Sequence, residues 1–337
     1  MTSELISLDH GSGGKIAHRL TTELFLPLFD NPILSDLHDG AVLALNDNTR
    51  IAFSTDTFTV TPLFFPGGDI GELAVNGTVN DVAMCGAAPL FISLALIIEE
   101  GFPMADLSRI LQSVQRAAMQ AGVQVVTGDT KVVPKGTADG LFINTSGLGV
   151  IPADVNIGST GAKPGDKIIL SGTMADHGMT ILTQREGLSF DSDMQSDSAP
   201  LNHMVAKILE ASSNVHVLRD PTRGGVGTTL NEIAESSQSG IVLQESLLPV
   251  RETVAGACEL LGFDPLYVAN EGKLLAFVAA EDADGVLNAI RSDTFGRDAC
   301  IIGEVTTDHP GQVVLETHIG GRRIVDMLTG EQLPRIC

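Results

Sequence analysis

The feature that most constrains the fold is an alternation of strand and helix patterns, which runs through two blocks of the chain. In the first block, β-branched and apolar runs predict strands at 51–60, 90–98, 123–128 and 141–150. Helical periodicity lies between these runs at 69–85 and 103–121, and the second helix opens with a proline. Such a block is expected to form a sheet that packs against helices.

The second block follows residues 151–166, whose glycines, prolines and small polar residues indicate a linker. Its strand patterns are at 167–171, 215–218, 241–244, 274–279 and 300–305. Its helical patterns are at 178–186, 200–212, 226–237, 251–261 and 282–291. We therefore predict an α+β fold of two α/β domains, residues 1–155 and 156–325, followed by a mobile tail at 326–337.

The length and charge of the chain narrow the classes of protein to consider. With 337 residues, the chain suits two domains of average size. Its net charge of −22 repels phosphate backbones, so we expect no nucleic-acid partner. No run of about 18 apolar residues predicts a membrane helix, and the first residues do not resemble a signal peptide. We therefore expect a cytoplasmic protein with no membrane partner.

Four cysteines are present, and none has the spacing of a zinc site. Cys85, Cys258 and Cys300 lie in apolar stretches, which is typical of buried, unreactive thiols. Cys337 differs because it follows Pro334 at the end of the predicted tail, where a thiol should be sterically open. Eleven extended residues at ~3.3 Å each would let the tail reach ~36 Å. Because exposed free thiols are usually avoided, a role for Cys337 is favoured over an accidental position.

The segment HGSGGK contains three glycines within four residues. Its residues are His10, Gly11, Ser12, Gly13, Gly14 and Lys15. Such a backbone can approach a phosphate closely and direct N–H groups at it, and a helical pattern follows at once. The segment is not a Walker loop, because Asp9 and Ile16 stand where that motif needs Gly and Ser or Thr. A flexible N-terminal turn is the alternative interpretation.

Four aspartates stand among small residues, each following or ending an apolar segment. They are Asp56 in STDT, Asp81 in VNDVA, Asp129 in TGDTK and Asp220 in RDPTRGG. Carboxylates at the rim of a sheet are suitable ligands for Mg²⁺, which takes hard oxygen donors beside substrate phosphates. Singly, each could instead be a turn former or a helix cap. Asn80 could add a neutral oxygen ligand or cap locally.

Three cations and one further acid are candidate site residues. Lys15 and Lys131 are notable in a chain with only 20 Lys and Arg, because a lysine beside a polyphosphate offsets its charge. Arg223 precedes two glycines, which suggests a tight turn near a ligand. All three could equally be solvated surface charges. Glu271, between two apolar stretches, could be a partly buried general base with a raised pKa, or a structural turn residue.

At these residues the sequence resembles the HypE family of hydrogenase maturation factors. The matching stretches are HGSGGK, AFSTDTFTVTPLFFPGGDIG, NGTVNDVA, VTGDTKVV, LFINTSGLG, DHGMTIL, RDPTRGGV, ANEGKL and the final PRIC. They occur in order along almost the whole chain, so the resemblance does not rest on one short motif. The wider superfamily includes aminoimidazole ribonucleotide synthetase, selenophosphate synthetase and thiamine-phosphate kinase.

The resemblance implies two domains of the aminoimidazole ribonucleotide synthetase type, a homodimer formed by the N-terminal domain, and ATP with Mg²⁺ near the junction of the domains. It implies that residues 10–15 cover the nucleotide and that Cys337, Glu271 and Lys131 are catalytic. It assigns the metal to Asp56, Asp81, Asp129 and Asp220. It assigns further nucleotide contacts to Asn80, Thr127, Gly128, Thr130 and Arg223.

The reaction implied by the resemblance is the ATP-dependent dehydration of an S-carboxamide on Cys337 to S-thiocyanate. The cyano group then passes to the iron of a precursor of [NiFe]-hydrogenase. A carbamoyl donor resembling HypF and an acceptor resembling the HypC–HypD complex are the implied partners. Two alternatives stay open: an ATP-dependent enzyme acting on a diffusible small substrate, and a non-enzymatic acidic adaptor whose tail thiol binds a partner.

Overall fold

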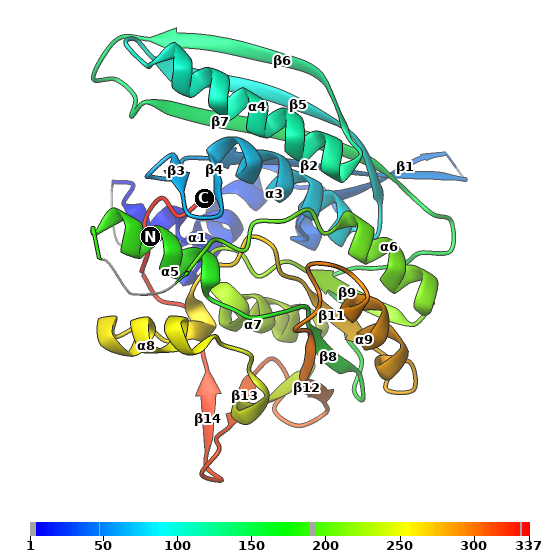
Figure 1. Cartoon of the computed structure of the whole chain (residues 1–337). Helices are drawn as coiled ribbons and strands as arrows, with labels where there is room; N and C mark the ends of the chain where they lie inside the picture. The colour runs from blue at the N-terminus through cyan, green and yellow to red at the C-terminus, as the bar shows by residue number, and fades with distance from the viewer. Residues whose placement is uncertain (1–4, 47, 189–192, 331) are drawn as a thin grey trace.

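The computed structural model describes residues 5–46, 48–188, 193–330 and 332–337. It contains two large sheets, each packed against helices, and Figure 1 shows the first sheet in the upper half and the second in the lower half. The coil at 152–166 joins the two. This mixture of helices and sheets is the predicted fold class.

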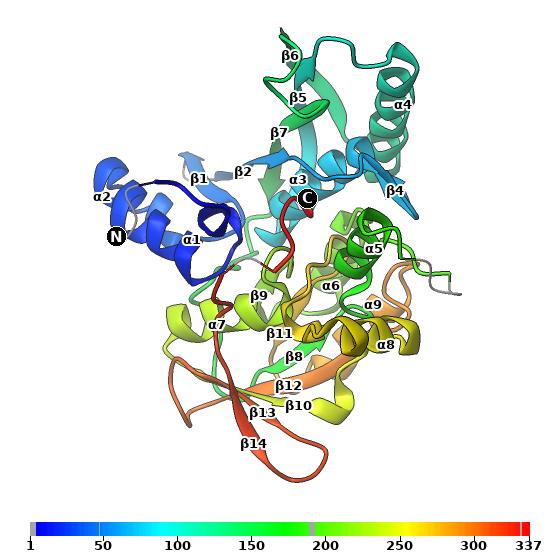
Figure 2. The same cartoon turned by 90° about the vertical axis from the view of Figure 1, so that its left-hand side faces the viewer.

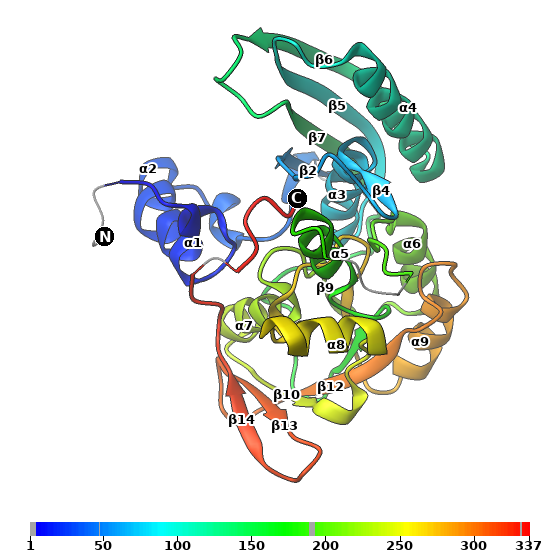
Figure 3. The same cartoon turned by 60° about the vertical axis from the view of Figure 1, so that its left-hand side comes forward.

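The first sheet has the strand order β1-β2-β7-β5-β6, in which only β5 and β6 are parallel. Its strands are β1 Ala41–Asn46, β2 Thr49–Phe58, β5 Ala88–Glu99, β6 Gln124–Val133 and β7 Leu141–Ile151. Helices α3 (Ile70–Met84) and α4 (Met104–Ala121) pack together against one face, and the short strands β3 (Phe64–Phe65) and β4 (Gly68–Asp69) lead into α3. Among the described residues of this domain, no helix covers the opposite face (Figures 1 and 3).

The second sheet has the order β14-β13-β10-β12-β8-β11-β9. Its strands are β8 Lys167–Leu170, β9 Val215–Arg219, β10 Gly240–Gln244, β11 Leu275–Val278, β12 Cys300–Thr306, β13 Val313–Glu316 and β14 Arg322–Val325. Its helices are α5 Asp176–Arg185, α6 Asn202–Ala211, α7 Gly225–Ser237, α8 Glu252–Leu261 and α9 Ala283–Arg291. The strands β8 and β11 are almost fully apolar, as expected for strands that are buried on both faces.

Helix α3 lies at the junction of the two domains. Its residues are nearly all buried, and Val82 and Met84 share one apolar cluster with Ile169 of β8 and Met204 of α6. A helix that is apolar around most of its circumference is expected to be buried on all sides. The common core therefore fixes the position of α3, and of the side chains that it carries, relative to the second domain.

The C-terminal segment of the chain ends at this junction, whereas the N-terminal helices extend away from it (Figures 2 and 3). Helix α1 (Lys15–Leu20) continues through a π-helical turn, Thr21–Phe25, into α2 (Leu26–Phe29), and this N-terminal unit projects from the body (Figure 3). The red C-terminal segment returns from β14 and ends between α3 and α5 (Figure 2). The last residues are thus adjacent to both domains.

The strand and helix patterns predicted at 51–60, 69–85, 90–98 and 103–121 are all present. The short strands β1, β13 and β14 were not predicted. Strand β6 is longer than predicted and contains Asp129, which was expected to follow a strand. Within the parts of the chain that the structure describes, no helix combines the length and the apolar character needed to cross a membrane.

Candidate active site at the domain junction

The structure brings four of the predicted acids together. Asp56 comes from β2, Asp81 from α3, Asp220 from the residue after β9, and Glu271 from the loop before β11. Burial, followed by the negative charges of Asp220 and Asp56, raises the pKa of Asp81 well above its usual value. Burial, and then the charges of Asp56 and Asp220, raises the pKa of Glu271 in the same way. These acids therefore form one mutually repelling cluster, in which Asp220 and Glu271 are buried and Asp56 and Asp81 are half-buried.

Asp39, which the sequence analysis missed, belongs to the same cluster. Its charge raises the pKa of Asp220, after burial, and contributes to the raised pKa of Asp81. Arg219 is buried and forms ion pairs of 2.7 Å with both Asp39 and Glu232. Asp39 lies just before β1, a strand that was not predicted, so its position at a strand end was not visible in the sequence.

The donor set of the cluster fits a magnesium ion that arrives with a polyphosphate. Two buried carboxylate oxygens, Asp39 Oδ2 and Glu271 Oε1, have no hydrogen-bond partner among the described residues. Like-charged carboxylates with unpaired oxygens attract a divalent cation. Among the residues described, however, no three His, Cys, Asp or Glu side chains converge as a ready metal site. Mg²⁺ commonly takes only one or two carboxylates and completes its shell with phosphate oxygens and water.

Cys337 lies beside this cluster, and it is buried rather than open as predicted. Its residue is 8% exposed, and its side chain joins the apolar cluster that contains Phe58, Ile70 and Ile336. Burial raises the pKa of the Cys337 thiol to about 12, although the Arg223 guanidinium opposes the shift. The prediction of an open thiol fails because the tail fills an apolar site between the domains. Its predicted mobility stays a prediction.

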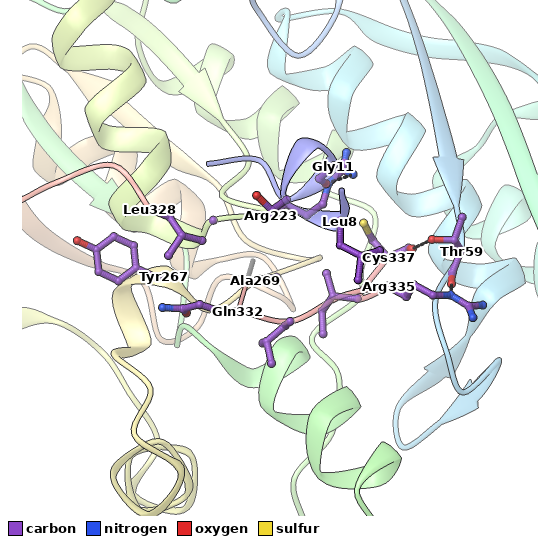
Figure 4. A pocket seen from close by; sticks show the side chains of 14 residues that line it. Leu8, Gly11, Thr59, Arg223, Tyr267, Ala269, Leu328, Gln332, Arg335 and Cys337 are labelled. Carbon is purple, nitrogen blue, oxygen red and sulfur yellow. Dashed lines mark hydrogen bonds between the residues drawn. The ribbon is translucent and has the colours of Figure 1, made fainter. Parts of the chain in front are cut away.

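A cavity of ≈ 210 Å³ opens next to the thiol. Figure 4 shows the Cys337 sulfur on the same side of the tail as Arg223 and Gly11, which are among the residues that line this cavity. Arg223 Nη1 donates a hydrogen bond of 3.1 Å to the carbonyl of Gly11. The cavity thus brings together the tail, the RDPTRGG loop and the glycine-rich segment.

The glycines of residues 10–15 allow close contact with the chain's own backbone. Gly13 has φ +77°, and a Cβ atom there would lie 2.9 Å from the Arg223 carbonyl oxygen. A Cβ atom on Gly14 would lie 2.3 Å from the carbonyl oxygen of Leu328, which accepts a hydrogen bond from Lys15 N at 2.8 Å. Lys15 Nζ forms an exposed ion pair with Asp326 at 2.8 Å. The segment is therefore held against the start of the tail.

His10, Ser12 and Asn80 are engaged in local or interdomain contacts. Ser7 N donates to His10 Nδ1 at 3.0 Å, and Ser12 Oγ donates to the Asp9 carbonyl at 2.8 Å. Asn80 Oδ1 accepts from Leu201 N at 2.8 Å, while its Nδ2 donates to the Ala199 carbonyl at 3.0 Å. Asn80 thus links α3 to the second domain, and Ser12 and Gly11 line the cavity.

The remaining candidates, Thr127, Gly128, Asp129, Thr130 and Lys131, all lie on β6, apart from the cluster. Across the sheet, Asp129 on β6 pairs with Ala95 on β5, and Ala95 pairs with Asn144 on β7. The next residue on β7, Thr145, pairs with Asp56 on β2. Three strand spacings of ~4.8 Å therefore separate Asp129 from Asp56 by ~14 Å.

The two aspartates also point to opposite faces of the sheet. Ser54 is two residues before Asp56 and therefore lies on the same face of β2, and it donates a 2.6 Å hydrogen bond to Asp81 on α3. Asn144 shares the face of Ala95 and Asp129, and it donates to Thr57 Oγ1 on the uncovered face. Asp129 and Lys131 form an exposed ion pair of 2.7 Å instead. Within a single chain, Asp129 therefore lies apart from the acids with which it was predicted to hold a metal, and its metal-binding role stays a prediction.

The comparisons with known proteins agree with the two-domain architecture. Residues 37–151 match the N-terminal domain of AIR synthase related proteins, and residues 163–316 match the C-terminal domain of the same class. The fold and the junction site thus define a member of the AIR synthase related class.

Within this class, the chain belongs to the HypE family. It is 55% identical over 332 residues to the carbamoyl dehydratase HypE of Cupriavidus necator, covering 98% of this chain and 95% of that relative. It superposes on a crystal structure of a HypE–HypF complex with a TM-score of 0.88 at 49% identity, covering 92% of this chain and 99% of the other. For a crystal structure of the hydrogenase maturation protein HypE in complex with ATP, the TM-score is 0.83 at 53% identity, covering 99% and 100%.

Proposed function

We propose that this protein is an ATP-dependent carbamoyl dehydratase that converts an S-carboxamide on its own Cys337 to S-thiocyanate. The observation that carries the proposal is the buried Cys337 sulfur, which faces Arg223 beside a cluster of acids whose pKa values are raised. Family membership supports the reaction, because relatives are named carbamoyl dehydratase and one solved relative holds ATP.

The reaction needs a better leaving group than the amide oxygen. In the proposed sequence, the carboxamide oxygen attacks the γ-phosphorus of ATP, and ADP leaves. Both N–H protons are then lost and phosphate is expelled, which forms the C≡N bond. Glu271 would accept a proton: its buried Oε1 has no hydrogen-bond partner among the described residues, and its raised pKa suits a general base. Arg223 offsets the negative charge that accumulates beside the sulfur.

A polyphosphate cannot approach the acids alone. Two unit charges 4 Å apart repel by roughly 4 kcal/mol at an effective dielectric constant near 20, and several carboxylates add to this barrier. One or two carboxylates among Asp56, Asp81 and Asp220 would hold Mg²⁺ together with phosphate oxygens, and the ion would supply the compensating charge on the transferring phosphoryl group. Asp39 is a further candidate ligand, positioned by its ion pair with Arg219.

Because the Cys337 thiol is buried, attachment of the carbamoyl group and its later dehydration would occur in two different positions of the tail. A thiol with a pKa of about 12 is almost entirely protonated at neutral pH and is a poor nucleophile. The carbamoyl group must therefore be attached while the tail is undocked, after which the loaded tail returns to the cavity. A HypF-type protein is the proposed donor, since a relative forms a HypE–HypF complex. A HypC–HypD complex, and through it the iron of an [NiFe]-hydrogenase precursor, is the proposed acceptor.

The uncovered face of the first sheet supports a homodimer. Phe53 and Ile97 lie on this face and are 42% and 45% exposed, and β6 is an edge strand that pairs only with β5 among the described strands. Apolar side chains beside an open strand edge favour association with another chain. A dimer of this kind would deliver Asp129 and Lys131 of each subunit to the site of the other, which would reconcile the metal assignment of Asp129 and the catalytic assignment of Lys131 with their position.

The test is the mass of the tail. Protein carbamoylated by a HypF-type donor is incubated with Mg-ATP, and the C-terminal peptide is weighed before and after. We expect the loss of one water from the peptide that contains Cys337, together with release of ADP and phosphate. Cys337→Ala should bind ATP but show no such change. ATP turnover with an unchanged tail mass would contradict the proposal and favour a diffusible substrate.

A further inference from the structure

The main chain of the tail is bound along its last four residues. Each carbonyl from Pro334 to Cys337 accepts a hydrogen bond from a group outside the tail. Such bonds recognise the backbone, while the apolar side chain of Ile336, which is 3% exposed, fills a site in the core. The position of the Cys337 sulfur is therefore set by groups that do not themselves touch the sulfur.

Arg185, the last residue of α5, connects three parts of the molecule. Its Nη1 donates to the Pro334 carbonyl at 2.6 Å, and its Nη2 donates to the Arg335 carbonyl at 2.8 Å. Its Nε and Nη2 also donate to the carbonyl of Thr61, which follows β2, at 3.0 and 2.8 Å. One planar guanidinium, with its five donors in a fixed geometry, thus links the second domain, the first domain and the tail.

His177, from the first turn of α5, holds the next carbonyl. It is fully buried, with Nε2 at 2.8 Å from the Ile336 carbonyl and Nδ1 at 2.8 Å from Ser196 Oγ. A carbonyl oxygen can only accept, so Nε2 must carry the hydrogen. Burial lowers the pKa of His177, which keeps the ring neutral and makes Nδ1 the acceptor for the Ser196 hydroxyl. The ring is therefore fixed in one tautomer.

Thr59 completes the set from the first domain. Its N–H donates to the Cys337 carbonyl at 2.8 Å, and its hydroxyl donates to the same oxygen at 3.2 Å. The tail is consequently held from both sides: by α5 of the second domain and by the residues that follow β2 in the first.

We propose that Arg185 and His177 are positioning residues that hold the docked tail and thereby place the Cys337 sulfur in the cavity. Their role in docking follows from the contacts alone, whereas its consequence for dehydration rests on the proposed function. Loss of either residue should increase the undocked fraction of the tail, expose Cys337 and slow the dehydration of carbamoylated protein.

The primary experiment measures the alkylation of Cys337 by iodoacetamide, without ATP or a carbamoyl donor. We expect wild-type Cys337 to react more slowly than a free LPRIC peptide. Arg185→Ala and His177→Leu should each accelerate the reaction at least tenfold, whereas Arg185→Lys and His177→Gln, which keep a donor, should restore part of the protection. Arg291→Ala is the matched control, because Arg291 also ends a helix and donates to a distant backbone carbonyl, that of Ala299. It should leave Cys337 unchanged.

Global unfolding is separated from tail release by the buried Cys258, whose alkylation should stay slow in every variant. If Arg185→Ala does not fold, the same decision is made with Arg185→Lys and the two His177 variants. Equal alkylation of Cys337 in wild type and in folded variants, or a wild-type rate equal to that of the peptide, would overturn the proposal. If the variants release the tail as expected but carbamoylated wild-type protein is not dehydrated, the proposed function would be refuted and the positioning role would stand.

Discussion

Strands β2 and β6 carry similar motifs, STDT around Asp56 and TGDT around Asp129, yet they place their aspartates in opposite environments. Burial raises the pKa of Asp56, although the charge of Arg223 and a hydrogen bond from Thr57 N oppose the shift. The hydrogen bond from Lys131 lowers the pKa of the exposed Asp129. The difference arises from strand order and helix placement: β2 is an interior strand facing α3, while β6 is an edge strand whose aspartate faces solvent.

A short motif therefore indicates chemistry only once its position in the sheet is known. The cluster around Asp56 is proposed to take an external cation, whereas Lys131 already pairs with Asp129 on β6. Within one chain, ~14 Å and the thickness of the sheet separate the β6 residues from the acidic cluster, so their proposed role in the site is assigned to a second chain. The following predictions test this division of roles, in order of decreasing effect.

The largest effect on the rate of dehydration is expected from a substitution in the acidic cluster around Asp56. Glu271→Gln should lower the rate of tail dehydration by about 10²–10⁴-fold, the usual contribution of a general base, while ATP binding is retained. Because the pKa of Glu271 is raised, wild-type activity should fall as the pH decreases through that pKa, where the base becomes protonated. Single-turnover mass spectrometry against pH measures both effects. A variant that keeps the wild-type rate would remove Glu271 from the mechanism.

The second prediction concerns Lys131 on the exposed strand β6. Lys131→Met should slow dehydration by about 10²-fold, as expected for loss of a group that stabilises charge in the transition state. Mixing it with Cys337→Ala and allowing subunits to exchange should restore about a quarter of wild-type activity, because half of the dimers are mixed and each has one complete site. Persistent inactivity of the mixture would show that Lys131 does not act across the dimer.

The third prediction uses the titration of the docked thiol. Burial raises the Cys337 pKa from 9.0 to about 12, so docking is fully supported below pH 9 and weakens as the pH rises towards 12. Each pH unit in this window should favour release of the tail about tenfold. Hydrogen exchange at about pH 8 and about pH 10 should show loss of tail protection, but no matching loss in β6. Cys337→Ser is the control, and the same pH-dependent loss in that variant would exclude the thiol as the cause.

Much of the secondary structure was predictable because strand and helix periodicities are local properties of the sequence. The short strands β1, β13 and β14 were missed, since four to six residues carry little periodic signal and β14 begins with two arginines. The family resemblance assigned Asp56, Asp81, Asp129 and Asp220 to a metal and Glu271 to catalysis, and the structure places three of these aspartates together with Glu271. The separation of Asp129, the inclusion of Asp39 and the burial of Cys337 depend on sheet order and interdomain packing, which no local pattern encodes.

The smallest effect tests why the two faces of the first sheet differ at all. Helix α3 covers one face and begins at Asp69, whose Oδ1 accepts hydrogen bonds from Gly71 N at 2.8 Å and Glu72 N at 3.3 Å. Asp69→Ala removes this N-cap and should reduce the free energy of unfolding by about 0.5–2 kcal/mol, whereas Asp69→Asn should retain much of it. Thermal unfolding should show a decrease of about 2–4 °C for each kcal/mol lost. Because α3 carries Asp81, activity should fall together with stability, while exposure of Lys131 on β6 should not change. A change confined to β6 would mean that α3 does not create the difference between the two faces.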